Sequence, residues 1–341
     1  MKIAIRPADL KEDKDLLIAT LGRYLTSSSN EERFRWLYER NPHGPTRAWL
    51  AQDTASGATV GASAAFPRKI AVNGSETTGW VLGDFCIADD YRSLGPALQL
   101  QKATLAAVDE LREATCCYDF PSRQLTATYR RMGINPVGQL IRFARPLRLD
   151  SKLQQLIKPA ALARPASWIA NSAMRIRDLR IPRGPRLNFE IHKSECGPEF
   201  TQLADAAADK NGIQVKRSAD HLNWRYLQHP FVQYEILTAR KQGDLQGYLV
   251  FSSSSEHAQV AEWCAASDDI AAALINESVR RLRKTNATVV STWLLDKDPR
   301  SKLLKEIGFW PRESTPVMVY WAGSESGLNN QWLFMYGDRD S

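Results

Sequence analysis

The sequence predicts an α/β fold of the α+β type, arranged as two tandem domains that are each a mixed, twisted sheet flanked by helices. Three observations support this prediction. A sequence landmark in the first half recurs in the second, strand-like and helix-like runs follow the same order in both halves, and helices follow strands near the end of each half, which is typical of a mixed sheet. The length of 341 residues also favours two domains over one.

The repeated landmark is Trp-x-Tyr-x-x-x-Pro, which starts at Trp36 and recurs from Trp224 at the same spacing. Three further matches follow in the same order: Gly57-x-x-x-Gly61 with Gly243-x-x-x-Gly247, Asp84-Phe85-Cys86 with Glu262-Trp263-Cys264, and Gly133-Ile134 with Gly308-Phe309. A period this long indicates a duplicated domain. The predicted division is a first copy over residues 1–147, a linker over 148–186, a second copy over 187–325 and a C-terminal tail over 326–341. Because the aromatic residues occur in both copies, we predict that Trp36, Tyr38, Trp224 and Tyr226 pack in the core.

In the first copy, residues 3–5 are predicted to open the sheet and residues 10–38 to be helical. Strands are predicted over 48–53, 59–66 and 69–72. Asn73-Gly74 is a typical hairpin turn into the next strand, since both residues tolerate a positive φ.

Composition excludes several classes of protein. Hydrophobic residues make up 43% of the chain and charged residues 24%, as in an ordinary globular protein. No apolar run approaches the roughly 18 residues of a membrane span, and the N-terminus lacks a signal-peptide core, so we expect a cytoplasmic protein. The five cysteines and five histidines show no metal-ligand spacing, so no metal is expected.

The net charge of +7 is concentrated between the two predicted copies, where residues 156–186 carry seven Lys and Arg against one Asp. Such a Pro- and Arg-rich arm is most often a solvated linker, and contact with RNA or a membrane surface is the less favoured alternative. DNA is not an expected partner.

A short segment of the first copy predicts an anion-binding turn. A buried strand over residues 81–87 is followed by Tyr91-Arg92-Ser93-Leu94-Gly95-Pro96-Ala97 and then by a helix with one apolar face. A glycine here lets the backbone approach a ligand, and the first N–H groups of the helix point toward it. The structural alternative is that Gly95 and Pro96 simply mark the start of a helix.

Two motifs carry a resemblance to a known family. Arg92-x-x-Gly95-x-Ala97 resembles the pyrophosphate-binding signature of the GNAT acyl-CoA transferases, Gln/Arg-x-x-Gly-x-Gly/Ala, and Tyr129-x-x-x-Gly133-Ile134 resembles the Tyr-x-x-x-Gly-Phe ending of the same family. The resemblance is to tandem-GNAT proteins, which include relatives that act on amino sugars or cell-envelope polysaccharide precursors. It implies acetyl-CoA as the co-substrate.

The resemblance also implies roles for individual residues. Tyr129 would protonate the departing thiolate, and a backbone amide near Cys86 or Ile87 would polarise the carbonyl. The expected residues of the coenzyme A site are Cys86, Ile87, Arg92, Ser93, Leu94, Gly95, Pro96 and Ala97. Asp84, on the same strand, is the best candidate for the general base, directly or through water. The structural alternatives are a sheet-edge or capping carboxylate for Asp84 and a core tyrosine for Tyr129.

The second copy lacks these features. Its matching segment, residues 267–273, contains no glycine and carries Asp268 and Asp269, which would repel a pyrophosphate, and Leu304 replaces the tyrosine. We therefore expect the second copy to be degenerate and to shape the substrate cleft.

The expected function is acyl-CoA-dependent acylation of the amine of a small polar or sugar-like acceptor by a monomer or homodimer. Two alternatives stay open. One is an aminoacyl-tRNA-dependent transferase of the tandem-GNAT type, and the other is a non-catalytic regulator that binds acyl-CoA.

Overall fold

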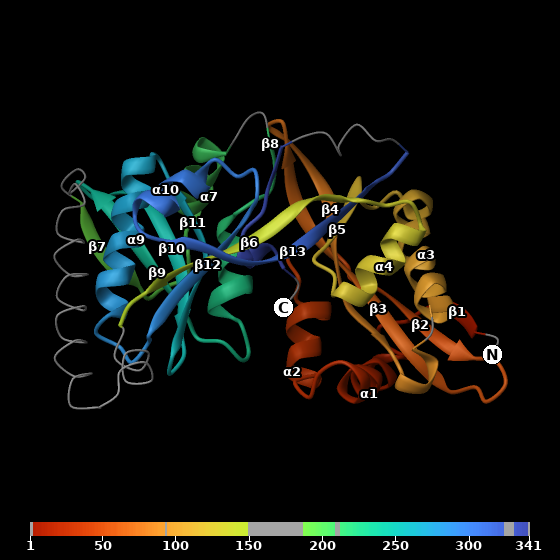
Figure 1. The fold of residues 1–341 in the computed structure, drawn as a ribbon. Helices are drawn as coiled ribbons and strands as arrows, with labels where there is room; N and C mark the ends of the chain where they lie inside the picture. The colour runs from red at the N-terminus through yellow and green to blue at the C-terminus, as the bar shows by residue number, and fades with distance from the viewer. Residues whose placement is uncertain (1–2, 93, 149–186, 209–211, 324–330, 340–341) are drawn as a thin grey trace, which may run out of the picture.

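The computed structural model describes residues 3–92, 94–148, 187–208, 212–323 and 331–339, with the two halves of the chain side by side (Figure 1). Residues 149–186 of the predicted basic linker lie outside the described residues. The predicted fold class is confirmed, because a mixed sheet of 14 strands runs through both halves and is flanked by helices. The division into two tandem copies stays a prediction.

The first half consists of the following elements: β1 (Ile3–Pro7), α1 (Lys14–Tyr24), α2 (Glu31–Phe34), a π-helical turn (Arg35–Glu39), β2 (Arg47–Asp53), β3 (Thr59–Val72), β4 (Ser75–Ile87), a 3₁₀ turn (Asp89–Tyr91), α3 (Leu94–Leu111), β5 (Cys116–Asp119), α4 (Arg123–Arg131) and β6 (Pro136–Pro146). The second half consists of β7 (Asn188–His192), α7 (Pro198–Ala207), β8 (Gly212–Val215), α8 (Ala219–Leu222), a π-helical turn (Asn223–Leu227), β9 (Tyr234–Lys241), β10 (Asp244–Ser253), β11 (His257–Ala265), α9 (Asp268–Leu282), β12 (Val289–Leu295), α10 (Arg300–Glu306), β13 (Trp310–Trp321), β14 (Gln331–Leu333) and a 3₁₀ turn (Tyr336–Asp338).

Within residues 10–38, which are predicted to be helical, the chain leaves α1 after Tyr24 and starts α2 at Glu31. Residues 26–30 are Thr, three Ser and Asn, whose short polar side chains compete for backbone hydrogen bonds. Asn30 then caps α2, since its side chain accepts a hydrogen bond from the backbone N–H of Arg33 at 2.9 Å.

The two strands predicted over residues 59–66 and 69–72 form one strand, β3. The pairing of β3 with β2 ends at Ala65. At Pro67, β3 therefore pairs with β4 and no longer with β2. A proline is tolerated at such an edge. The predicted Asn73-Gly74 turn is confirmed, with φ values of 48° and 83°.

The last strands of the two halves are exchanged. The strand order is β1-β2-β3-β4-β5-β13-β6-β12-β11-β10-β9-β7. Strand β13, near the end of the chain, therefore lies between β5 and β6, and β6, the last strand of the first half, lies between β13 and β12. Strand β4 is parallel to β5, and β11 is parallel to β12. The pairings that connect β5 to β12, which are β5 with β13, β13 with β6 and β6 with β12, are all antiparallel. Because the direction reverses three times, β4 and β11 run in opposite directions.

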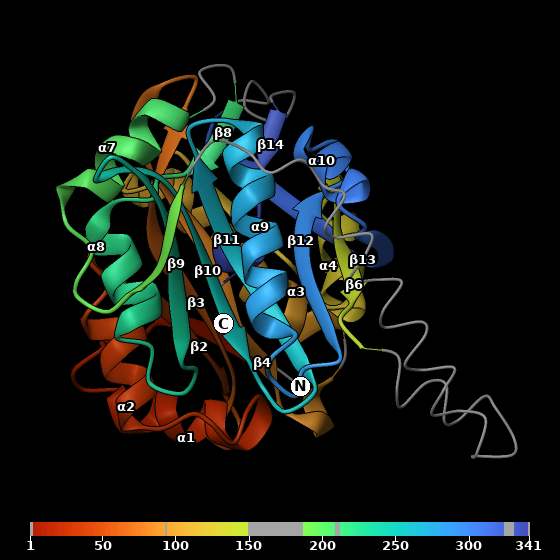
Figure 2. The same ribbon diagram turned by 90° about the vertical axis from the view of Figure 1, so that its left-hand side faces the viewer.

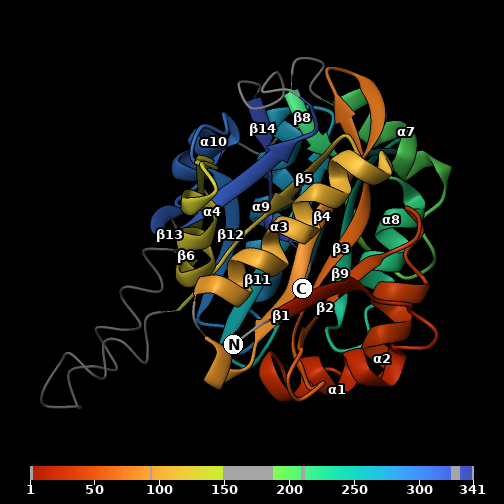
Figure 3. The ribbon, with the colours of Figure 1, turned by 90° about the vertical axis from the view of Figure 1, so that its right-hand side faces the viewer.

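The exchanged strands carry core residues for the opposite half. Val317 and Val319 of β13 are at most 2% exposed and belong to the same buried cluster as Leu37 and Tyr118 of the first half. Phe143 of β6 belongs to the cluster formed by α9 and strands of the second half. Helix α3 covers one face of the first-half sheet (Figure 3), and α9 covers strands β9 to β11 in the second half (Figure 2).

The two repeated Trp motifs meet at the centre of the molecule. The Trp36 and Trp224 rings stack with centroids 5.4 Å apart. Each indole N–H donates to the backbone carbonyl of the other tryptophan, at 2.8 and 2.9 Å. The predicted core packing is confirmed, since Trp36, Tyr38, Trp224 and Tyr226 are all at most 6% exposed. This reciprocity supports a duplicated origin.

Part of the predicted C-terminal tail belongs to the sheet. Strand β14 pairs with β8, which also pairs with β3 of the first half. The Asp338 carboxylate accepts two hydrogen bonds from Arg217 at 2.8 and 2.9 Å. None of the helices in the described residues is long and apolar enough to cross a membrane.

Cleavage of the chain within residues 149–186 is expected to leave the two fragments bound to each other, because β6 and β13 each complete the sheet of the opposite half. A protease site inserted after residue 165, followed by size-exclusion chromatography of the cleaved protein, measures this. Residues 1–148 expressed alone are expected to aggregate, since the edge of β5 that β13 covers would be exposed. Two fragments that separate as folded monomers would contradict the strand exchange.

Candidate functional site

The predicted site lies where β4 ends, and the strand is irregular there. Ala62 of β3 pairs with Cys86 and Ala64 pairs with Gly83, so Asp84 and Phe85 together oppose one residue of β3. Asp84 has a φ of 49°, which is uncommon for a residue other than glycine. This β-bulge turns the end of the strand, as bulges beside functional sites often do.

Beyond the bulge, the edge of β4 that faces away from β3 lacks a paired strand among the described residues. Strands β4 and β5 pair only from Gly79 to Val81, while β4 continues to Ile87. The N–H of Ala88 donates to Val60 of β3 at 2.7 Å. Backbone N–H groups alternate between the two edges of a strand, so the N–H of Ile87 points toward the β5 side. The strand end therefore offers a backbone donor in the gap between β4 and β5.

Helix α3 follows this strand end after the short 3₁₀ turn at Asp89–Tyr91. Gly95 lies in its first turn, is exposed and does not have a positive φ, and a Cβ built on it would meet no atom within 4 Å. The fold itself thus does not require glycine here, and the space beside the helix start is open. Pro96 is buried and Ala97 is half-buried behind it.

The other residues of the expected coenzyme A site differ in what they offer. Arg92 forms an exposed ion pair with Asp89 at 2.7 Å. The side chain of Cys86 is buried, and burial raises the pKa of its thiol to about 12, so only its backbone is available. Leu94 starts α3, and Ser93 lies outside the described residues.

Asp84 is buried and held by three hydrogen bonds. Its carboxylate accepts from both terminal nitrogens of Arg33, at 2.6 and 2.8 Å, and from the Tyr38 hydroxyl at 2.6 Å. The side chain is 2% exposed. Acting as a base would require one of these bonds to open, and the role of Asp84 stays a prediction.

Tyr129 lies on the other face of the sheet, in the buried cluster beneath α3 and α4. Its hydroxyl donates to Asp119 at 2.8 Å and accepts from the amide of Gln101 at 2.9 Å. Burial, and then the charge of Asp119, raise the pKa of Tyr129 well above its usual value. The tyrosine therefore keeps its proton throughout the ordinary pH range. Its catalytic role also stays a prediction.

The sequence interpretation missed four residues of these networks: Arg33, Tyr38, Gln101 and Asp119. Tyr38 could have been found, because it belongs to the repeated motif and its counterpart Tyr226 donates to Glu262 at 2.7 Å, just as Tyr38 donates to Asp84. Gln101 and Asp119 have no signal in the sequence, since only the packing of α3 on β5 brings them to Tyr129.

Comparisons with known proteins rest on structure alone. No protein-family model matches the sequence, and no curated protein matches it. A GCN5-related N-acetyltransferase from Anabaena variabilis matches with a TM-score of 0.66 at 16% identity, over 93% of this chain and 72% of that one. The chain has the fold of the GCN5-related N-acetyltransferases. A probable N-acyltransferase from Enterococcus faecalis matches at 0.66 and 13% identity, over 94% and 72%.

The GCN5-related fold is also shared with the N-myristoyltransferase of Saccharomyces cerevisiae, solved with bound myristoyl-CoA. This match has a TM-score of 0.58 at 11% identity and covers 93% of this chain and 82% of that one. These alignments span both halves of the chain. Among the described residues, no group of three or more His, Cys, Asp or Glu side chains is arranged to hold a metal ion.

Replacing Asp84 by Asn is expected to lower the free energy of unfolding by about 3 kcal/mol or more, because the buried Arg33 guanidinium loses its charged partner. Urea denaturation at pH 7 measures this. Glu262→Gln is the matched control at the corresponding place in the second half. Burial raises the pKa of Glu262, because the folded state disfavours the charged carboxylate. As the pH rises through the pKa of Glu262 in the folded state, the wild type therefore loses stability relative to Glu262→Gln. A larger loss from Glu262→Gln than from Asp84→Asn would contradict these assignments.

Proposed function

We propose that the protein is an acyl-CoA-dependent N-acyltransferase, with acetyl-CoA as the acyl donor and the amine of a small polar or sugar-like molecule as the acceptor. The observation that carries the proposal is the unpaired edge at the end of β4. The backbone N–H of Ile87 points into the gap there, and the long helix α3 starts shortly afterwards in the chain. The fold, shared with an enzyme that holds myristoyl-CoA, supports the same reading.

The residues at this strand end fit a coenzyme A thioester. The first-turn N–H groups of α3 suit a pyrophosphate, because they have no partner inside the helix and the helix dipole favours an anion. Gly95 leaves open the space that a side chain would fill. Pro96 removes one donor, but at a position where the helix would leave it unused. Acyl-CoA would supply an activated carbonyl carbon.

In the proposed reaction the nitrogen of the acceptor bonds to the carbonyl carbon, the carbon–sulfur bond breaks, and the sulfur leaves as a thiolate that takes a proton. The N–H of Ile87 would stabilise negative charge on the carbonyl oxygen, a contribution worth about 10²–10³ in rate for a well-placed donor. Tyr129 would supply the proton if its O–H turns from Asp119 toward the gap between β4 and β5. Asp84 would accept the proton of the amine, directly or through water.

A second candidate is a protein that binds acyl-CoA without turnover. The observation that favours it is the saturation of Asp84 and Tyr129 by hydrogen bonds to buried partners. Binding and turnover therefore need separate tests.

Gly95→Glu is expected to abolish binding of acetyl-CoA, because the new carboxylate fills the open space and repels the pyrophosphate. Calorimetry with acetyl-CoA measures this. Gly197→Glu is the matched control: this glycine precedes α7 in the second half, and a Cβ on it also meets no atom within 4 Å. If both variants bind acetyl-CoA as the wild type does, the start of α3 is not the site.

Tyr129→Phe is expected to lower the turnover rate by at least about 10²-fold while acetyl-CoA affinity is retained, because a positioned acid contributes about 10²–10⁴. Thiol release with a panel of amines measures it. Tyr118→Phe is the control, since the Tyr118 hydroxyl is buried with no hydrogen-bond partner among the described residues. Binding without turnover in the wild type would favour the second candidate. An unchanged rate in Tyr129→Phe would leave the tyrosine a packing residue.

A further inference from the structure

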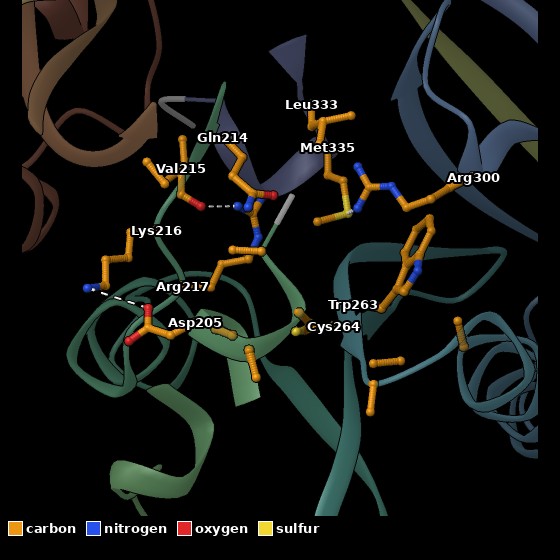
Figure 4. A pocket seen from close by; sticks show the side chains of 18 of the residues that line it. Asp205, Gln214, Val215, Lys216, Arg217, Trp263, Cys264, Arg300, Leu333 and Met335 are labelled. Carbon is orange, nitrogen blue, oxygen red and sulfur yellow. Dashed lines mark hydrogen bonds and ion pairs between the residues drawn. The ribbon is translucent and has the colours of Figure 1, made fainter. Parts of the chain in front are cut away.

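The second half contains a cavity of about 400 Å³ that the proposed reaction does not use. It lies between the end of α7, strand β8, the end of β11 and the start of α9, with Arg300 and β14 closing it (Figure 4). In the order of elements, this is where the first half has the end of β4 and the start of α3.

The cavity is far from the proposed acyl-CoA site. Ile87 pairs with Gly61 of β3, and Ala71, which lines the cavity, lies ten residues further along that strand. At about 3.3 Å per residue this corresponds to roughly 30 Å. The cavity is therefore a separate site.

The cationic side chains of the cavity wall are already neutralised. Lys216 binds Glu76 at 2.8 Å and Asp205 at 3.5 Å. Arg217 binds Asp338 at 2.8 Å and lies 3.5 Å from Glu262, and Arg300 binds Asp298 at 2.5 Å. Carboxylates outnumber cations in these pairs, so the described part of the wall offers no net positive charge to an anion.

One carboxylate of the described wall, that of Asp268, has no cationic partner. Asp268 is exposed in the first turn of α9, and no hydrogen bond or ion pair involves its side chain among the described residues. The helix is capped by Ser267, whose hydroxyl accepts from the N–H of Ile270 at 3.4 Å. A pyrophosphate would thus meet a negative charge and a capped helix.

The rest of the described wall is uncharged and mixed in size, with Trp263, Gln214, Val215 and Cys264 beside smaller residues. Alanines line it from α7, β11 and α9, together with Leu333 and Met335 of the C-terminal segment. Because alanine side chains are short, they leave space beside the apolar side chains of Trp263, Leu333 and Met335. At about 30 Å³ per water-sized unit, the volume suits a ligand of roughly a dozen non-hydrogen atoms.

We propose that this cavity binds a small primary amine with an apolar body, its ammonium group on Asp268 and its body against the alanines, Leu333 and Met335. The site differs from the acyl-CoA site in place and in charge, and the proposal stands whether or not the protein transfers acyl groups.

The probe is 2-phenylethylamine, followed by ligand-observed NMR titration of the full chain, with 2-phenylethanol as the neutral analogue of equal size. We expect the amine to bind at millimolar concentration or below, and Asp268→Asn to weaken it at least about tenfold, the effect of losing one charged hydrogen bond. Asp269→Asn is the matched control, since Asp269 lies in the same first turn but does not line the cavity.

A blocking variant separates this cavity from other acidic surfaces. Ala207 is exposed at the rim, so Ala207→Trp is expected to abolish binding without disturbing the core. The proposal is overturned if the amine does not bind, or if 2-phenylethanol binds as well as the amine. It is also overturned if Asp268→Asn and Asp269→Asn weaken binding equally, or if Ala207→Trp binds the amine as the wild type does.

Discussion

The exchange of β6 and β13 is the constraint on which the rest of the structure depends. Each strand completes the sheet of the opposite half and carries buried side chains into its core, as Val317 and Phe143 do. The exchange also sets the geometry of the two candidate sites. Because β6 and β13 lie antiparallel between the two halves, β4 and β11 end at opposite edges of the sheet. The two strand ends therefore cannot form one cleft, and each must be understood by its own chemistry.

The carboxylates at the two strand ends show how that chemistry diverges. Asp84 is bound by an arginine from the helix beside it and by Tyr38. The Glu262 carboxylate accepts hydrogen bonds from two tyrosine hydroxyls. The neighbouring Arg217 donates hydrogen bonds to the carboxylate of Asp338, near the end of the chain. The ionised form of Asp84 thus has a dedicated partner, whereas the pKa of Glu262 is raised by burial.

The parts of this protein that could be predicted from sequence are those fixed by local patterns. The turn at Asn73-Gly74, the strand before Asp89 and the helix after Gly95 follow from residue types within a few positions. Long-range order could not be predicted in this way. Nothing near Val319 indicates that it pairs with Tyr118 of the other half. The partners of Tyr129 likewise come from distant elements, α3 and β5. The break between α1 and α2 also has a local signal, a run of Ser and Thr before Asn30.

The start of the helix that follows each strand end differs in chemistry between the two halves. At α3, Gly95 leaves an open space beside the first turn of the helix, which suits an anion. At α9, the Ser267 hydroxyl occupies the N–H of Ile270, and Asp268 and Asp269 bring two negative charges to the same turn. Both helices have a dipole of the same sign, so the difference comes from side chains alone. The two proposed sites therefore differ through a few side chains in one turn, while the sheet that supports both positions is continuous.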